Sequence, residues 1–131
     1  MNKKILVTGS LLGLIAIILG AFGAHGLKSL ISIESIQTFE TGVRYQMYHA
    51  LFLLFIGSYS SLIEKKKQIV FYMVLLGVLL FSGSIYMLAT NELTNFDFKR
   101  IGFITPLGGL LLIIAWIILL INFLKIKADK S

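Results

Sequence analysis

Cysteine is absent from this 131-residue sequence, and histidine occurs only twice, as His25 and His49. The lack of cysteine excludes disulfide bonds, thiolate metal ligands and cysteine nucleophiles. The two histidines need a third ligand such as Glu40 to hold a metal ion, and no ligand spacing in the sequence supports that set. We therefore expect neither a bound metal nor a cofactor.

Catalytic and nucleotide-binding motifs are missing as well. No glycine-rich phosphate loop stands before a soluble helix, and no serine occupies a nucleophile elbow. No carboxylate falls within any of the long apolar runs, which argues against a carboxylate-based proton relay inside a membrane. These absences favour a protein that is not an enzyme.

Apolar residues dominate what is present. They make up 57% of the chain, and the mean hydropathy is +0.92. A soluble fold of this size has too little interior to bury so much apolar surface. Four uncharged apolar runs, 5–24, 45–63, 69–89 and 101–124, reach or approach the ~20 residues that a helix needs to cross a bilayer. We predict an all-α, integral-membrane four-helix bundle in which residues 1–131 form one transmembrane domain.

The connection between the first two runs has a helical pattern of its own. Over residues 27–42, apolar side chains recur at a spacing that loosely fits an amphipathic helix lying on the membrane interface. The alternative is an ordinary loop that happens to contain isoleucines. Both readings place the second membrane span at 45–63.

The distribution of positive charge predicts the orientation. The net charge of +6 suits anionic lipid headgroups better than nucleic acid, because the basic residues gather at the ends of the apolar runs. With four spans, both termini share one side of the membrane with the 64–68 turn. That side holds Lys3, Lys4, Lys65, Lys66, Lys67, Lys125, Lys127 and Lys130, and the other side holds Lys28, Arg44, Lys99 and Arg100. The positive-inside rule then places both termini in the cytoplasm of a multi-pass protein of the cell inner (plasma) membrane.

The stretch GAFGAHGL, residues 20–27, resembles the end of a signal peptide. A basic start and an apolar run precede it, and the stretch itself consists largely of small residues. However, the apolar run of about 20 residues exceeds the usual 7–15 of a signal peptide. Phe22 would also occupy the −3 position, where a small residue is required. We expect the segment to be retained as a membrane helix, with cleavage as the alternative.

Small residues form a continuous stripe along this first helix. They are spaced four, three, four and three apart: Gly9, Gly13, Ala16, Gly20 and Gly23. Helices in lipid associate by close backbone approach, so such a stripe predicts a helix-packing surface. General enrichment of glycine in membrane helices is the alternative explanation.

Polar residues gather toward the outer end of the predicted bundle. The topology brings seven of them to similar depth as a candidate ligand-binding or polar cluster: His25, Arg44, Tyr45, His49, Ser84, Tyr86 and Thr105. An ionisable residue within a membrane span, such as His49, is a functional candidate by default. The structural alternatives are a histidine that hydrogen-bonds across a helix contact, an arginine that pairs with Glu40 or lipid phosphate, and an aromatic belt. Thr105 is also placed to cap the fourth helix, with Pro106 in its first turn.

Four ordered stretches, GAFGAHGL, FETGVRYQMYHALFLL, LFSGSIYML and ITPLGG followed by Trp116, carry a resemblance over essentially the whole chain. The sequence resembles a small bacterial membrane-protein family of the YgdD/YwdK type, to which a mitochondrial branch is related. The resemblance implies a four-helix inner-membrane protein of unknown molecular function, some of whose members are linked to membrane integrity. The 94–100 loop and the basic tail depart from the family pattern.

Three functions are compatible with these residues. The first is a non-enzymatic scaffold, accessory or membrane-integrity protein with membrane lipids, a second copy or another membrane protein as partner. The second is a small transporter or channel that acts as an oligomer and has a polar site at the outer leaflet. The third is a membrane enzyme that uses His25 with His49, or either with Glu40, as an acid–base pair. No nucleic-acid partner is expected.

Overall fold

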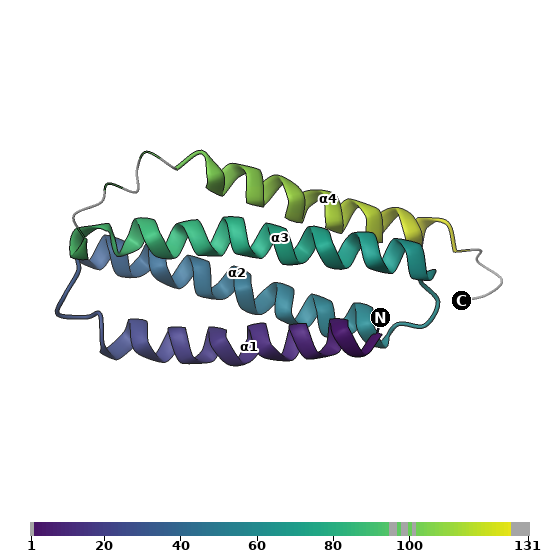
Figure 1. Ribbon diagram of the computed structural model, residues 1–131, viewed down its shortest axis with the longest axis horizontal. Coiled ribbons are helices and arrows are strands. Elements are labelled where there is room, and N and C mark those ends of the chain that lie inside the picture. The colour runs from purple at the N-terminus through teal and green to yellow at the C-terminus, as the bar shows by residue number, and fades with distance from the viewer. Residues whose placement is uncertain (1, 95–96, 98–99, 101, 127–131) are drawn as a thin grey trace.

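The computed structural model describes residues 2–94, 97, 100 and 102–126. This part of the chain forms four long helices and no strand (Figure 1). They are α1 (Asn2–His25), α2 (Ile33–Ser58), α3 (Glu64–Ala89) and α4 (Ile104–Leu124), with a short 3-10 helix η1 (Asn91–Leu93) between α3 and α4. The predicted all-α membrane bundle is confirmed. Ile101, Lys99, Lys127 and Lys130, on which parts of the predictions rest, lie outside the described residues.

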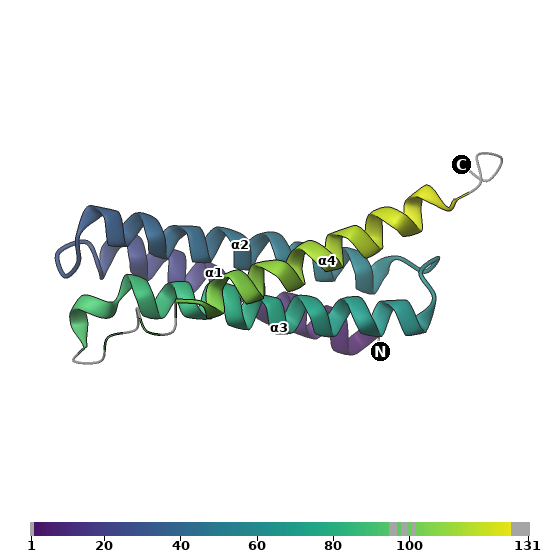
Figure 2. The ribbon, with the colours of Figure 1, turned by 90° about the horizontal axis from the view of Figure 1, so that it is seen from above.

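The four helices run alternately up and down, so that the start of α1 and the end of α4 lie at the same end of the bundle (Figure 1). Along the chain, α1 packs on α2, α2 on α3, and α3 on α4. Figure 2 shows α4 running obliquely across the bundle, from α3 at its start toward α2. The core between the helices contains fully buried side chains such as Leu53, Phe71 and Val74.

The second helix is longer than the sequence suggested. Helix α2 begins at Ile33 and passes Tyr45 without a break, so residues 27–42 do not form a separate interfacial helix. Ser32 caps its start, because its hydroxyl oxygen accepts a hydrogen bond from the Ser35 backbone N–H at 3.1 Å. Phe39, on the added part of α2, is buried with Leu27 in a second small core at the end of the bundle where α1 ends and α2 begins. This burial explains why the helix extends beyond the apolar run.

The start of the third helix also differs from the sequence prediction. The 64–68 segment is not a free basic turn, because Glu64 to Lys67 form the first turn of α3. Lys67 is only 2% exposed and donates a hydrogen bond to Asn2 Oδ1 at 3.0 Å. Lys4 reaches the Tyr72 hydroxyl at 2.6 Å. These contacts join the starts of α1 and α3 at the end of the bundle that holds the predicted cytoplasmic charges.

The surface of the bundle is apolar where a membrane would contact it. Large hydrophobic side chains such as Ile17 and Leu79 are more than half exposed. Within the described residues, α1, α3 and α4 are long and apolar enough to span a membrane. Helix α2 is as long as α3, but its first half carries charged and amide side chains. A membrane crossing by α2 and cytoplasmic termini stay predictions.

The stripe of small residues on α1 lies against α2. A Cβ added at Gly9 would lie 3.0 Å from the Ala50 carbonyl oxygen, and one at Gly23 would lie 2.9 Å from the Phe39 ring. Gly13 and Gly20 leave ordinary van der Waals room, at 3.6 and 3.4 Å from the nearest atoms of α2. The stripe is therefore used within the chain, and this face of α1 is not available to a partner.

The first prediction concerns the contact between η1 and the start of α2. Glu92 Oε1 accepts hydrogen bonds from the Ser35 hydroxyl at 2.8 Å and from the Ser32 backbone N–H at 3.4 Å. These bonds, the Ser35 bond first, hold the pKa of Glu92 below its ordinary value because they favour the carboxylate. We expect Ser35→Ala to raise the pKa of Glu92, measured by NMR titration of its labelled carboxyl carbon.

The sign of the accompanying stability change follows from the direction of this shift. The contribution of Glu92 is present above the ordinary pKa and is lost as the pH falls through the lowered pKa of the folded protein. Because Glu92 is fully exposed, the contribution to overall stability is small. Ser29→Ala, at an exposed serine of the α1–α2 connection, is the matched control and leaves the titration unchanged. An identical Glu92 titration in the Ser35 variant would contradict the assignment.

Candidate functional site

A glutamine at the centre of the bundle joins three helices. Gln46 of α2 is 4% exposed, and its amide nitrogen donates to the Leu12 carbonyl of α1 at 2.8 Å. Its amide oxygen accepts a hydrogen bond from the Tyr86 hydroxyl of α3 at 2.7 Å. Nearby, the Ser82 hydroxyl donates to the Gly42 carbonyl at 2.7 Å. These bonds satisfy polar groups that would be costly to leave unpaired in an apolar interior.

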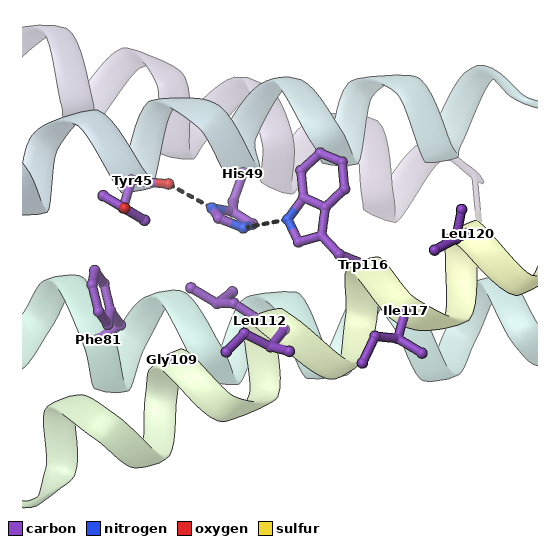
Figure 3. Close-up of a pocket in the computed structure, with 9 residues that line it drawn as sticks. Tyr45, His49, Phe81, Gly109, Leu112, Trp116, Ile117 and Leu120 are labelled. Carbon is purple, nitrogen blue, oxygen red and sulfur yellow. Dashed lines mark hydrogen bonds between the residues drawn. The ribbon is translucent and has the colours of Figure 1, made fainter.

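His49 lies one turn further along α2 and bonds to α4. Its Nδ1 is 2.7 Å from the Tyr45 carbonyl oxygen, and its Nε2 is 3.0 Å from Trp116 Nε1 (Figure 3). A carbonyl only accepts and an indole N–H only donates, so the proton sits on Nδ1 and Nε2 is the acceptor. The imidazole is therefore a neutral bridge between α2 and α4, 4% exposed. A second proton on Nε2 would break the bond to Trp116.

A third pair of polar groups joins the start of α4 to α3. The Ser84 and Thr105 hydroxyls form a hydrogen bond, and Ser84 also donates to the Phe81 carbonyl at 3.0 Å. Thr105 does not cap α4 as predicted, because the N-cap is Phe103, and among the described residues no side chain forms a cap hydrogen bond at this end. Its hydroxyl is used between helices instead.

A lateral groove separates α2 from α4. It has a volume of about 690 Å³, and the residues that line it are Tyr45, His49, Phe81, Gly109, Leu112, Ile113, Trp116, Ile117 and Leu120. We call this the α2–α4 groove. Figure 3 shows its side chains, with the His49 imidazole and the Trp116 indole bonded to each other at one side. Its lining is almost wholly apolar, because most of these residues are hydrophobic and the ring nitrogens of His49 and Trp116 are bonded to each other.

The structure does not gather the seven predicted polar residues into one site. Tyr45 and His49 line the groove, Ser84 and Thr105 bond to each other, and Tyr86 belongs to the Gln46 network. His25 is exposed at the end of α1. It lies at the level of Phe39, which contacts Gly23, and His49 is ten residues, about 15 Å, further along α2. The two histidines are therefore not an acid–base pair.

Arg44 has a different partner from the one considered. Its guanidinium donates to Thr41 Oγ1 at 3.0 Å, and within the described residues it forms no ion pair with Glu40. The side chain is exposed on α2, one residue before Tyr45. Arg44 is therefore outside the helix core, and it is not among the residues that line the groove.

Gln46 and Trp116 carry much of the observed geometry but were not among the predicted site residues. The sequence did contain a signal for Gln46, because it is an amide within the apolar run of the second span. It stands three residues before His49, which places the two side chains on adjacent parts of the helix surface. Trp116 had no such signal, because a lone tryptophan in an apolar helix is also typical of a lipid-facing position. Its pairing with His49 depends on the oblique path of α4.

The buried polar side chains in the described part of the bundle all have partners. No buried side-chain nitrogen or oxygen there lacks a hydrogen-bond partner. The same residues contain no group of three or more His, Cys, Asp or Glu side chains that could hold a metal ion. Chemically, this arrangement holds helices together and leaves an apolar groove open.

Comparison with known proteins identifies relatives along the whole chain. A family model described as "Protein of unknown function (DUF423)" matches residues 19–109. A UPF0382 membrane protein of Staphylococcus saprophyticus is 39% identical over 95% of this chain and 99% of its own length. YwdK of Bacillus subtilis, a UPF0382 membrane protein, is 36% identical over 94% of this chain and 98% of its own.

The name of a less similar relative also states a location in the cell. The UPF0382 inner membrane protein YgdD of Escherichia coli is 32% identical over 96% of this chain and 93% of its own length. No solved structure matches the chain. The resemblance drawn from the four sequence motifs is thereby confirmed.

Proposed function

This chain belongs to the DUF423 family of membrane proteins, and on that premise we propose that it is a non-enzymatic accessory protein of the cell membrane. Its binding surface is the α2–α4 groove, which holds the chain of a membrane-embedded molecule. The protein is multi-pass, lies in the inner (plasma) membrane and keeps both termini in the cytoplasm. Stabilising that molecule or presenting it to a partner would serve membrane integrity.

One observation carries this proposal: the buried polar side chains of the described residues all have hydrogen-bond partners within the protein, and the α2–α4 groove is lined almost wholly by apolar atoms. A catalytic site needs an acid, base or nucleophile directed at a substrate. Here the His49 nitrogens are bonded to Tyr45 and Trp116, and the Gln46 amide is bonded to Leu12 and Tyr86. Ligand sites that are mostly apolar suit apolar ligands.

The transporter alternative requires a polar path through the bundle. The described helices enclose a packed core at Leu53, Phe71 and Val74 instead. Its motivating residues are divided among three separate sets of contacts, as described above. No specific observation favours this alternative.

Filling the groove tests the proposal. Gly109 lines the groove, and a Cβ there would meet the Phe81 ring at an ordinary 3.5 Å, so Gly109→Leu is the change chosen to fill the groove with a larger side chain. Gly83 on α3 has no atom within 4 Å of an added Cβ, so Gly83→Leu is a matched control outside the groove. The probe is phosphatidylcholine with a photoreactive diazirine halfway along one acyl chain, in nanodiscs.

We expect cross-links in the wild type and in Gly83→Leu to concentrate at Ile113 and Ile117 of the groove, several-fold above Ile17 of α1. In Gly109→Leu the groove yield should fall to the level of Ile17, an ordinary lipid-facing residue. Peptide mass spectrometry locates the cross-links. Equal yields at the groove and at Ile17 in the wild type would overturn the proposal.

A further inference from the structure

Arg44 lies deeper than a charged residue normally does at the edge of a membrane span. Its neighbour Val43 lies at the level of Gly20 on α1, 3.4 Å from where a Cβ on that glycine would be. Gly20 is four residues, about one turn or 6 Å, before the end of the apolar run at Ala24. A guanidinium at this depth requires water or an anionic headgroup close to it.

Thr41 fixes the guanidinium on one side of α2. The Thr41 hydroxyl donates to the Gln37 carbonyl at 3.1 Å and accepts from Arg44 at 3.0 Å. Thr41, Tyr45 and His49 are spaced four apart and so follow one another along the same face of α2. That face lines the α2–α4 groove at Tyr45 and His49. The guanidinium is therefore held beside Thr41, one turn before the groove residue Tyr45 on that face, and we take this position as the mouth of the groove.

The length of the groove matches one leaflet. Its lining on α4 runs from Gly109 to Leu120, eleven residues or about 16 Å along the helix. The hydrocarbon core is ~30 Å thick, so one leaflet's acyl chains span about half of that. The Gly109 end lies beside Phe81, whose ring centroid is 4.9 Å from that of Tyr45. The groove thus descends from the level of Tyr45, next to Arg44, toward the middle of the bundle or beyond.

The charge at the mouth is complementary to a phosphate. A guanidinium has five N–H donors in a planar fork that matches phosphate oxygens, and one of Arg44's is bonded to Thr41. Tyr45 and Tyr48, with ring centroids 5.6 Å apart, follow Arg44 along α2, and tyrosine hydroxyls of this kind also bond to lipid headgroups. No carboxylate within the described residues is paired with Arg44.

We propose that the α2–α4 groove binds one phospholipid, with an acyl chain along Gly109–Leu120 and the phosphate on Arg44. This inference rests on the proposed function, because it names the occupant of the same groove. It goes further by requiring a phosphate, so a molecule with the same chains and no phosphate must bind less well. The occupied groove opens to the leaflet at the end of the bundle where α1 ends and α2 begins.

The test compares headgroups on identical chains. Phosphatidylglycerol and diacylglycerol, each with the diazirine acyl chain, are mixed at the same low mole fraction into phosphatidylcholine nanodiscs that contain the full-length protein. We expect phosphatidylglycerol to label Ile113 and Ile117 at least about tenfold more than diacylglycerol, which is the lower end of the range for a hydrogen bond to a charged group. Arg44→Gln should remove this preference, and Arg44→Lys should keep part of it.

Lys28→Gln is the matched control, since it removes one exposed positive charge at the same end of the bundle. It should leave the headgroup preference unchanged. If diacylglycerol labels the groove as strongly as phosphatidylglycerol, the phosphate inference is wrong while the groove still binds a chain. If neither lipid labels the groove above Ile17, both proposals fail. A preference that survives in Arg44→Gln would also overturn the assignment to Arg44.

Discussion

Gly108→Ala is expected to destabilise the protein by about 2–4 kcal/mol, the upper range for overpacking a tight contact. An added Cβ would lie 2.9 Å from both the Gly77 carbonyl oxygen and the Leu80 carbonyl carbon, and closer still to the Phe81 nitrogen. These are backbone atoms of α3, which cannot rotate away as a side chain can. The loss should exceed the ~1 kcal/mol that alanine gains over glycine in a helix.

The adjacent glycine provides the control for this prediction. Gly109→Ala makes the same change in helix propensity, but its Cβ meets only the Phe81 ring at an ordinary 3.5 Å. It should be neutral or slightly stabilising. Unfolding in mixed micelles with increasing dodecyl sulfate, followed by circular dichroism, measures both free energies. Equal unfolding midpoints for the two variants would show that the α3–α4 contact is looser than its geometry indicates.

This pair of glycines shows where sequence reasoning stops. Hydropathy predicted the helices because membrane spans must be apolar over a fixed length. The periodic stripe on α1 indicated which face packs closely, since all its members lie on one helix. The difference between Gly108 and Gly109 depends on which of them faces α3, and that is set by the crossing of two helices. No local pattern encodes it.

The candidate site shows the same limit. The topology placed Ser84 and Thr105 at one depth, and they are bonded to each other. It also grouped His25 with His49, because an assumed span beginning at Tyr45 concealed how far α2 continues toward the loop. The extension depends on the burial of Phe39 with Leu27, a contact between segments that the hydropathy pattern does not connect.

The remaining large effect is expected at Gln46. Gln46→Leu keeps nearly the same volume but removes the acceptor of the Tyr86 hydroxyl and the donor to the Leu12 carbonyl. Leaving a half-buried hydroxyl without this partner should cost about 1–2 kcal/mol of unfolding free energy. Tyr86→Phe breaks only one of these bonds but leaves the buried Gln46 amide oxygen unpaired, so it should cost a similar amount. The same micelle unfolding measurement applies to both variants.

The double variant decides whether these residues act as a unit. If the Gln46–Tyr86 bond holds α2 to α3, the loss in the double variant should be smaller than the sum of the single losses, by about 0.6–1.7 kcal/mol. Additive losses would mean that each side chain contributes by packing alone. The cycle also bears on function, because a network that holds the bundle together should affect assembly without altering the headgroup preference at Arg44. A change of that preference in Gln46→Leu would instead connect the interior network to the groove.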